Sequence, residues 1–139
     1  MNRTILVVED NELNMRLFTD LLEVHGYTVL QAQLGMEGLE LARERRPDLV
    51  VMDIQLPDVS GLDVIRSLKE DGALRAIPVL AVTAFAMRGD QEKISEAGSD
   101  AYMSKPIEVR KFVAVVGGLL GETPQVASAP SSPFRHPHL

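Results

Sequence analysis

The sequence predicts a doubly wound α/β domain in which helices cover both faces of a five-stranded parallel sheet. The first observation is a strict alternation: five short aliphatic runs are each followed by a longer stretch of helical periodicity. Such alternation is typical of parallel strands joined by right-handed crossovers. The second is that the runs are almost purely apolar, as expected of strands buried on both faces. The third is size, because 139 residues, 45% of them hydrophobic, suit a single core.

The first two strand–helix pairs are predicted from apolar runs and helix stops. Residues 4–8 are β-branched and apolar, which favours a buried strand. Residues 12–25 carry apolar side chains at helical spacing up to a glycine stop. Residues 27–32 are the second expected strand, and the second helix is expected over residues 36–46, ahead of Pro47.

The middle of the chain continues the alternation. Residues 49–52 are aliphatic and predict the third strand, and residues 78–82 predict the fourth. Between them a helix is expected over residues 60–69, where Ser60 and Asp63 have the spacing of a capping pair.

The last elements complete a five-stranded set. Residues 88–97 predict a polar, exposed helix, and residues 101–103 a brief fifth strand. Residues 107–120 predict the final helix, which Gly117 and Gly118 are expected to interrupt because each costs roughly 1 kcal/mol relative to alanine. Five strands suit the flavodoxin-like (βα)5 order 2-1-3-4-5, whose ligand site lies at the carboxyl ends of the strands.

Composition divides the chain and limits its partners. Residues 1–122 are predicted to form the domain, and residues 123–139, rich in Pro, Ser and Ala, a disordered tail. His136 and His138 in that tail make only a weak metal pair. A net charge of −6 disfavours direct binding of nucleic acid. The lack of cysteine and of a long apolar segment or signal-peptide pattern predicts a cytoplasmic protein without a membrane span.

Polar side chains fall where the predicted strands end. Glu9 and Asp10 follow the first strand, Asp53 the third, Thr83 the fourth and Lys105 the fifth. Because the carboxyl ends of parallel strands meet at one edge of a sheet, we expect three carboxylates, a hydroxyl and an ammonium to share a pocket.

Such a cluster of acids requires a cation. Two like charges at roughly 4 Å repel by about 4 kcal/mol at an effective dielectric constant of ~20. Lys105 supplies one positive charge, and Mg²⁺ suits the remainder because it takes oxygen ligands and completes its shell with phosphate oxygens. The backbone carbonyl of Gln55 is expected to be a further ligand. The sequence therefore predicts a magnesium site.

A carboxylate beside Mg²⁺ and a lysine is equipped for phosphoryl transfer. Asp53 would attack phosphorus and form an aspartyl phosphate, with Lys105 and Thr83 stabilising charge on the phosphoryl oxygens. Each residue alone has a structural explanation: Asp10 as a helix cap, Asp53 as a turn former, Thr83 as a strand residue and Lys105 as surface. Their coincidence at one edge favours the chemical interpretation.

These motifs resemble those of bacterial response regulator receiver domains. The resemblance is carried by VVED, LVVMDIQLPDVSGLDV, VLAVTA and the Lys105–Pro106 pair, and it covers the chain from Thr4 to about Leu120. The stretches VVEDNELNMRLFTDLL, MDIQLP and AVTAFAM are most similar to the single-domain DivK type, whose members regulate the cell cycle and polarity in alphaproteobacteria.

The resemblance implies a role for each site residue. It implies metal binding by Glu9 and Asp10, phosphorylation of Asp53, and contact of Lys105 with the phosphoryl group. It also implies a switch in which the Thr83 hydroxyl moves inward.

Two further features follow from the same resemblance. Tyr102 matches the switch aromatic of the family and is expected to rotate from exposed to buried. The Lys105–Pro106 bond is expected to be cis, since only X–Pro bonds adopt this form cheaply.

Partners are also implied by the resemblance. A histidine kinase or histidine phosphotransfer protein would donate the phosphoryl group, docking near Asn11, Asn14, Pro106 and Ile107, although Asn14 is equally well an ordinary helix residue. Output would pass to a protein effector in cell-cycle or polarity control, with recruitment to a cell pole by a membrane kinase. The alternative is a phosphorelay intermediate for a hybrid histidine kinase. In either case the protein is a switch that catalyses only its own phosphotransfer and dephosphorylation.

Three other classes fit less well. A hydrolase of the haloacid-dehalogenase type needs a second acid two residues after the nucleophile, where this chain has Gln55. A nucleotide-binding module needs glycines in the first loop, which reads VVEDNELN. A calcium loop built on Asp10, Glu12 and Asn14 lacks the required glycine, since Met15 takes its place.

Overall fold

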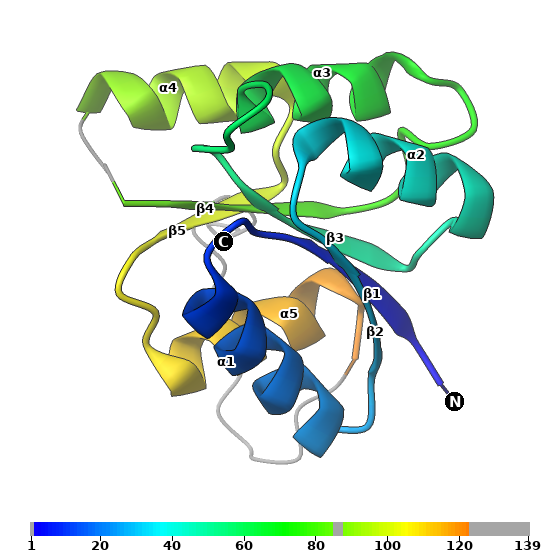
Figure 1. Cartoon of the computed structure of the whole chain (residues 1–139), viewed down its shortest axis with the longest axis vertical. Coiled ribbons are helices and arrows are strands. Elements are labelled where there is room, and N and C mark those ends of the chain that lie inside the picture. The colour runs from blue at the N-terminus through cyan, green and yellow to red at the C-terminus, as the bar shows by residue number, and fades with distance from the viewer. Residues whose placement is uncertain (1, 85–87, 123–139) are drawn as a thin grey trace.

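A computed structural model describes residues 2–84 and 88–122, which form one parallel sheet in the order β2-β1-β3-β4-β5 (Figure 1). The strands are β1 (Thr4–Val8), β2 (Thr28–Ala32), β3 (Leu49–Asp53), β4 (Val79–Thr83) and β5 (Ala101–Ser104). The helices are α1 (Glu12–Val24), α2 (Gly35–Arg45), α3 (Gly61–Glu70), α4 (Arg88–Ala97) and α5 (Val109–Leu119). The predicted fold class, strand order and elements are confirmed, with ends that differ by one or two residues. The tail predicted at residues 123–139 lies outside the described residues.

Helices cover both faces of the sheet. Helices α1 and α5 lie on one face, and α2, α3 and α4 lie on the other (Figure 1). Along β1, Ile5 and Val7 pack with the α1 and α5 side chains, whereas Leu6 and Val8 pack with the opposite layer. All four are fully buried. Burial on both faces explains why the central strands β1, β3 and β4 are almost continuously apolar in sequence.

The predicted interruption of the last helix is wrong. Helix α5 runs through both Gly117 and Gly118 to Leu119. A Cβ atom at either glycine would meet nothing within 4 Å, so neither glycine is required by a close approach. The helix continues because Phe112 and Val116 are fully buried on its inner face, and such packing outweighs weak propensity.

The structure shows which residues cap the two helices for which the sequence suggested a capping residue. Asn11, not Asp10, caps α1, since its side chain accepts a hydrogen bond from the Asn14 amide at 3.0 Å. This leaves the Asp10 carboxylate for the strand-end cluster. Ser60 caps α3 by accepting from the Leu62 amide, but the predicted reciprocal bond from Asp63 is replaced by an ion pair with Arg66 at 3.0 Å.

The helix predicted at residues 88–97 is only partly exposed. Ile94 and Ala97 of α4 are buried in the core between the sheet and the helices α2, α3 and α4. Within residues 2–84 and 88–122, none of the helices has the length and apolar character needed to cross a bilayer.

Candidate functional site

Three carboxylates meet at the carboxyl edge of the sheet. Ligand atoms of Glu9, Asp10 and Asp53 all lie within 4.8 Å of one another. Glu9 and Asp53 are buried, at 0% and 3% exposure, and Asp10 is exposed at the rim. They converge because β1 and β3 are parallel neighbours that end together, with Val8 paired to Met52. The predicted juxtaposition of these acids is confirmed.

Lys105 completes the cluster from the other side. Its Nζ lies 2.9 Å from Glu9 Oε1 and donates a hydrogen bond to Asp53 Oδ2 at 3.3 Å. The backbone amide of Lys105 donates to the Thr83 carbonyl at 2.8 Å, which extends the β4–β5 pairing to the lysine itself. The Lys105–Pro106 bond is cis, as the resemblance implied.

The cluster alters the ionisation of two of its members. Burial, and then the Glu9 charge, raise the pKa of Asp53 to about 6, although the Gln55 amide and the Lys105 charge act in the opposite direction. For Lys105, burial acts to lower the pKa, but contact with Glu9 and the charges of Asp53 and Glu9 outweigh it, so its pKa is raised. Lys105 is therefore an ammonium, and Asp53 ionises at a higher pH than an ordinary aspartate because of its burial and the Glu9 charge.

The donor set fits a hard divalent cation. Glu9 Oε1 is buried and, among the described residues, makes no hydrogen bond of acceptable geometry, although it forms the ion pair with Lys105. Three carboxylates face one ammonium, which leaves two negative charges without compensation when all are ionised. Carboxylate oxygens at this spacing are the ligands that Mg²⁺ takes in proteins. A divalent cation would compensate the surplus of two negative charges and give Glu9 Oε1 a second positive partner besides Lys105.

The loop after Asp53 is folded back onto the strand end. The Gln55 amide donates to Asp53 Oδ1 at 3.1 Å, and the Gly61 amide donates to the Ile54 carbonyl at 2.8 Å. A Cβ atom at Gly61 would collide with the backbone carbonyl of Asp53. Glycine is thus required at this position by a close backbone approach, which the sequence analysis did not identify.

Thr83 and Tyr102 lie on one face of the sheet. Thr83 is 2% exposed, and Tyr102 is half-buried against the α3–α4 layer, not exposed as expected, because its ring packs on the core beneath these helices. Tyr102 pairs in register with Ala81, two residues before Thr83, so Thr83 and Tyr102 point to the same face of the sheet on neighbouring strands. The register therefore places the predicted switch pair on one face.

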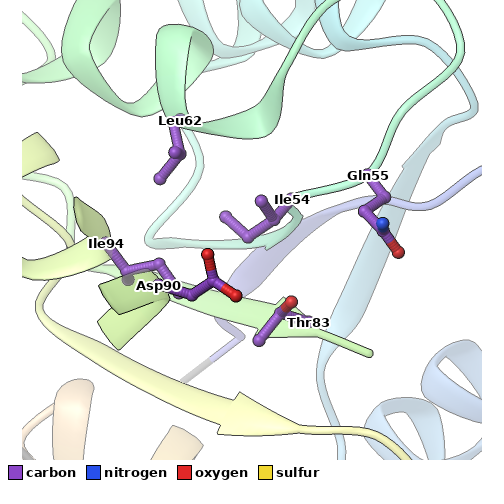
Figure 2. A pocket seen from close by; sticks show the side chains of 6 residues that line it. All are labelled: Ile54, Gln55, Leu62, Thr83, Asp90 and Ile94. Atoms are coloured by element: carbon purple, nitrogen blue, oxygen red, sulfur yellow. The ribbon is translucent and has the colours of Figure 1, made fainter. Parts of the chain in front are cut away.

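A small cavity adjoins Thr83. Its volume is about 100 Å³, and it is lined by Ile54, Gln55, Leu62, Thr83, Asp90 and Ile94. Figure 2 shows the carboxylate of Asp90, from the first turn of α4, extending towards Thr83 at the end of β4. Asp90 could not be identified from the sequence, because a polar residue on a polar helix gives no signal of what it faces.

The predicted docking residues flank the acid cluster along the chain. Asn11 and Pro106 are exposed, whereas Asn14 and Ile107 are half-buried. Asn11 and Asn14 are joined by the α1 cap, and Ile107 packs against the α1–α5 core. Their positions beside Asp10 and Lys105 are compatible with a docking surface, which stays a prediction.

Comparison with known proteins identifies relatives over almost the whole described chain. The family described as response regulator receiver domain matches residues 5–117. The polar-differentiation response regulator DivK of Brucella anthropi is 56% identical over 122 residues, covering 88% of this chain and 99% of that protein. The DivK protein of Brucella ovis is 55% identical with the same coverage.

Solved structures share the fold. The receiver domain of a sensor histidine kinase from Pseudomonas aeruginosa PAO1, which holds a magnesium ion in its active-site cleft, is 30% identical with a TM-score of 0.81, covering 88% of this chain and 100% of that one. A receiver domain of a histidine kinase from Syntrophus aciditrophicus is 29% identical with a TM-score of 0.81, covering 92% and 99%.

Proposed function

The chain belongs to the response regulator receiver domain family, and from this premise we propose that it is a switch activated by phosphorylation of Asp53. The observation that carries the proposal is the meeting of Glu9, Asp10 and Asp53 with Lys105 at the strand ends. A buried carboxylate between an acid pair and an ammonium has little structural use, because its ionisation is opposed. The Asp53 carboxylate is instead suited to accept a phosphoryl group, whose oxygens Lys105 can contact.

The proposed reaction is transfer from a phosphohistidine. A carboxylate oxygen of Asp53 attacks phosphorus, the P–N bond breaks, and the imidazole leaves as the acyl phosphate forms. Lys105 then stabilises the phosphoryl oxygens, since its Nζ already lies 3.3 Å from Asp53 Oδ2. The Gln55 amide donates to the other carboxylate oxygen of Asp53, Oδ1, and so holds the carboxylate in orientation.

Magnesium is proposed as the cofactor. Glu9, Asp10, Asp53 and the Gln55 carbonyl would hold it, and the ion would neutralise charge on the transferring phosphoryl group. The magnesium ion in the Pseudomonas receiver domain supports this choice for a site of the same family.

The phosphoryl group is proposed to act through Thr83 and Tyr102. The Thr83 side chain moves inward, and its hydroxyl donates a hydrogen bond to a phosphoryl oxygen. Tyr102 then moves into the space beneath α4 that the Thr83 side chain has left. The shared sheet face of the two residues supports the coupling. A swing in populations from 1:99 to 99:1 requires about 5.5 kcal/mol, which is within reach of a metal bridge and two charge-assisted hydrogen bonds of roughly 1.5–3 kcal/mol each.

The cellular role is proposed from the relatives. Identity of 55–56% to polar-differentiation regulators supports a role in cell polarity, with a histidine kinase or histidine phosphotransfer protein as donor and a protein as receiver of the signal. The proposed compartment is the cytoplasm, with recruitment to a cell pole by a membrane kinase. A phosphorelay intermediate is the second candidate, supported by the receiver domains of histidine kinases among the structural neighbours.

Intact mass after incubation with acetyl phosphate and Mg²⁺ tests the central step. The wild type is expected to gain one phosphate, and Asp53→Asn none, because the amide is not a nucleophile of comparable strength. Chelation of Mg²⁺ is expected to suppress the gain. Phosphate uptake by Asp53→Asn at the wild-type rate would refute Asp53 as the acceptor.

A further inference from the structure

Asp58 joins two separate parts of the molecule. It lies in the loop between β3 and α3, and its carboxylate accepts hydrogen bonds from the first amides of α2. The Gly35 amide donates to Oδ1 at 2.8 Å and the Met36 amide to Oδ2 at 3.0 Å. Residue Leu34 precedes α2 and provides no side-chain cap. The cap of α2 therefore comes from more than twenty residues further along the chain.

The amides of α2 favour the ionised form of the Asp58 carboxyl group. They lower the pKa of its carboxyl group, with the Met36 bond first and the Gly35 bond second. Asp58 is thus ionised and oriented towards the positive end of the helix, where a carboxylate is favoured.

Packing brings the same loop against the same helix. A Cβ atom built on Gly35 would lie 2.5 Å from a methyl group of Val59 and 3.3 Å from one of Leu56. Only a glycine at the first turn of α2 lets the loop lie this close. The hydrogen bonds of Asp58 and the contact at Gly35 fix the loop to the helix at two points.

The other end of this loop holds Asp53. The Gln55 amide donates to Asp53 Oδ1, and Gln55 and Ser60 form an antiparallel bridge that closes the loop. Residues 54–60 are therefore a short closed loop with the phosphoacceptor at its base and Asp58 near its tip.

We propose that Asp58 is a positioning residue for Asp53: by capping α2 it holds the loop of residues 54–60 in the conformation that presents the Gln55 backbone to the acid cluster. This rests on the proposed function in so far as Asp53 is the phosphoacceptor. Ile54, Leu56 and Val59 pack on the core, whereas Gln55, Pro57, Asp58 and Ser60 are exposed, so the hydrogen bonds of Asp58 are what restrain the polar side of the loop.

Two variants of Asp58 and one matched control test the proposal. Asp58→Ala removes both acceptors, and Asp58→Asn retains one, because an amide has a single acceptor oxygen. Glu37→Ala is the control: Glu37 Oε1 accepts from the Gln33 amide at 3.0 Å, so it also supports the start of α2, but from within the same segment. The measurements are amide hydrogen exchange at Gln55 and Gly61, and titration with Mg²⁺ alone followed by amide chemical shifts.

Asp58→Ala is expected to speed exchange at both amides and to raise the Mg²⁺ concentration at half saturation by roughly three- to tenfold, which lies within the change in an equilibrium constant that loss of a helix cap produces. Asp58→Asn is expected to fall between Asp58→Ala and the wild type, and Glu37→Ala to match the wild type in both readings. The rate of phosphorylation by acetyl phosphate at limiting Mg²⁺ is expected to fall in the same order.

The proposal is overturned if Asp58→Ala stays within twofold of the wild type in both readings, or if Glu37→Ala changes them equally. Wild-type protein that binds Mg²⁺ but accepts no phosphate would refute the proposed function alone. In that case, exchange and Mg²⁺ titration still decide the role of Asp58.

Discussion

At the scale of single residues, Asp53 combines a functional position with an unfavourable charge. Its pKa of about 6 lies above the ordinary value of 3.8. The charged groups that face it are Glu9, Asp10 and Lys105. Because the folded state holds the proton more tightly than the unfolded chain does, the unfolded chain loses its proton first as pH rises. The contribution of Asp53 to the free energy of unfolding therefore falls between about pH 4 and pH 6 and stays low above it.

This gives a pH-dependent prediction for metal-free protein. Asp53→Asn is expected to be more stable than the wild type by roughly 1–2 kcal/mol at pH 7.5 and to differ little at about pH 4.5, where wild-type Asp53 is protonated. Urea denaturation in the presence of a chelator measures both values. Excess Mg²⁺ is expected to stabilise the wild type more than the variant. An equal difference at the two pH values would contradict this assignment of charge.

The acid cluster could be predicted because its members end neighbouring parallel strands. Position in the chain and the rule for strand ends are enough to bring Glu9, Asp10 and Asp53 together. Asp58 and Asp90 could not be found in this way. The partners of Asp58 are amides of α2, and Asp90 lines a cavity with Thr83 of β4, so both relations depend on segments distant in sequence. A loop aspartate that caps a distant helix has the same local sequence as one in solvent.

At the scale of elements, the strands were the most predictable. The central strands β3 and β4 are buried on both faces, so their sequences are almost entirely apolar and their limits are visible. Helix α5 was less predictable because local propensity at Gly117 and Gly118 opposed the burial of its inner face, and burial prevailed. Propensity is a local quantity, whereas the packing that decided the case joins α5 to the sheet.

One lysine connects several elements at the amino edge of the sheet. Lys69, near the end of α3, donates from Nζ to the carbonyls of Arg75 and Ile77 at 3.2 and 2.9 Å and to Asp100 Oδ2 at 2.9 Å. Asp100 in turn accepts from the Val79 amide at 2.8 Å. The ammonium thus ties α3, the segment before β4 and the segment before β5 together.

Lys69→Met is expected to lower the free energy of unfolding by about 1–3 kcal/mol, because it leaves two carbonyls and a carboxylate without their charged donor while keeping the aliphatic packing. Urea denaturation measures the loss, with the exposed Lys93→Ala on α4 as the control. Phosphorylation by acetyl phosphate is expected to be unchanged, since Lys69 lies at the opposite edge from Asp53. Stability equal to that of the control would refute the role of the ammonium.

At the scale of the whole molecule, the two edges of the sheet serve different purposes. The carboxyl edge carries the acids and Lys105. At the amino edge, the Tyr27 hydroxyl donates to Glu122 Oε1 at 2.6 Å and so fastens the segment after α5 to the start of β2. Burial and this bond raise the pKa of Tyr27. The two tyrosines of the chain, Tyr27 and Tyr102, therefore report on the anchored edge and on the proposed switch face respectively.

This separation allows a direct test of the switch with fluorinated tyrosine. In the wild type, phosphorylation is expected to shift the ¹⁹F resonance of Tyr102, because the ring moves from half-buried to buried, and to leave that of Tyr27 in place. Thr83→Ala is expected to accept phosphate without shifting Tyr102, since the hydroxyl that links the phosphoryl group to the ring is gone. Tyr27→Phe assigns the two signals. A full Tyr102 shift in phosphorylated Thr83→Ala would show that the signal reaches α4 and β5 by a route that bypasses Thr83.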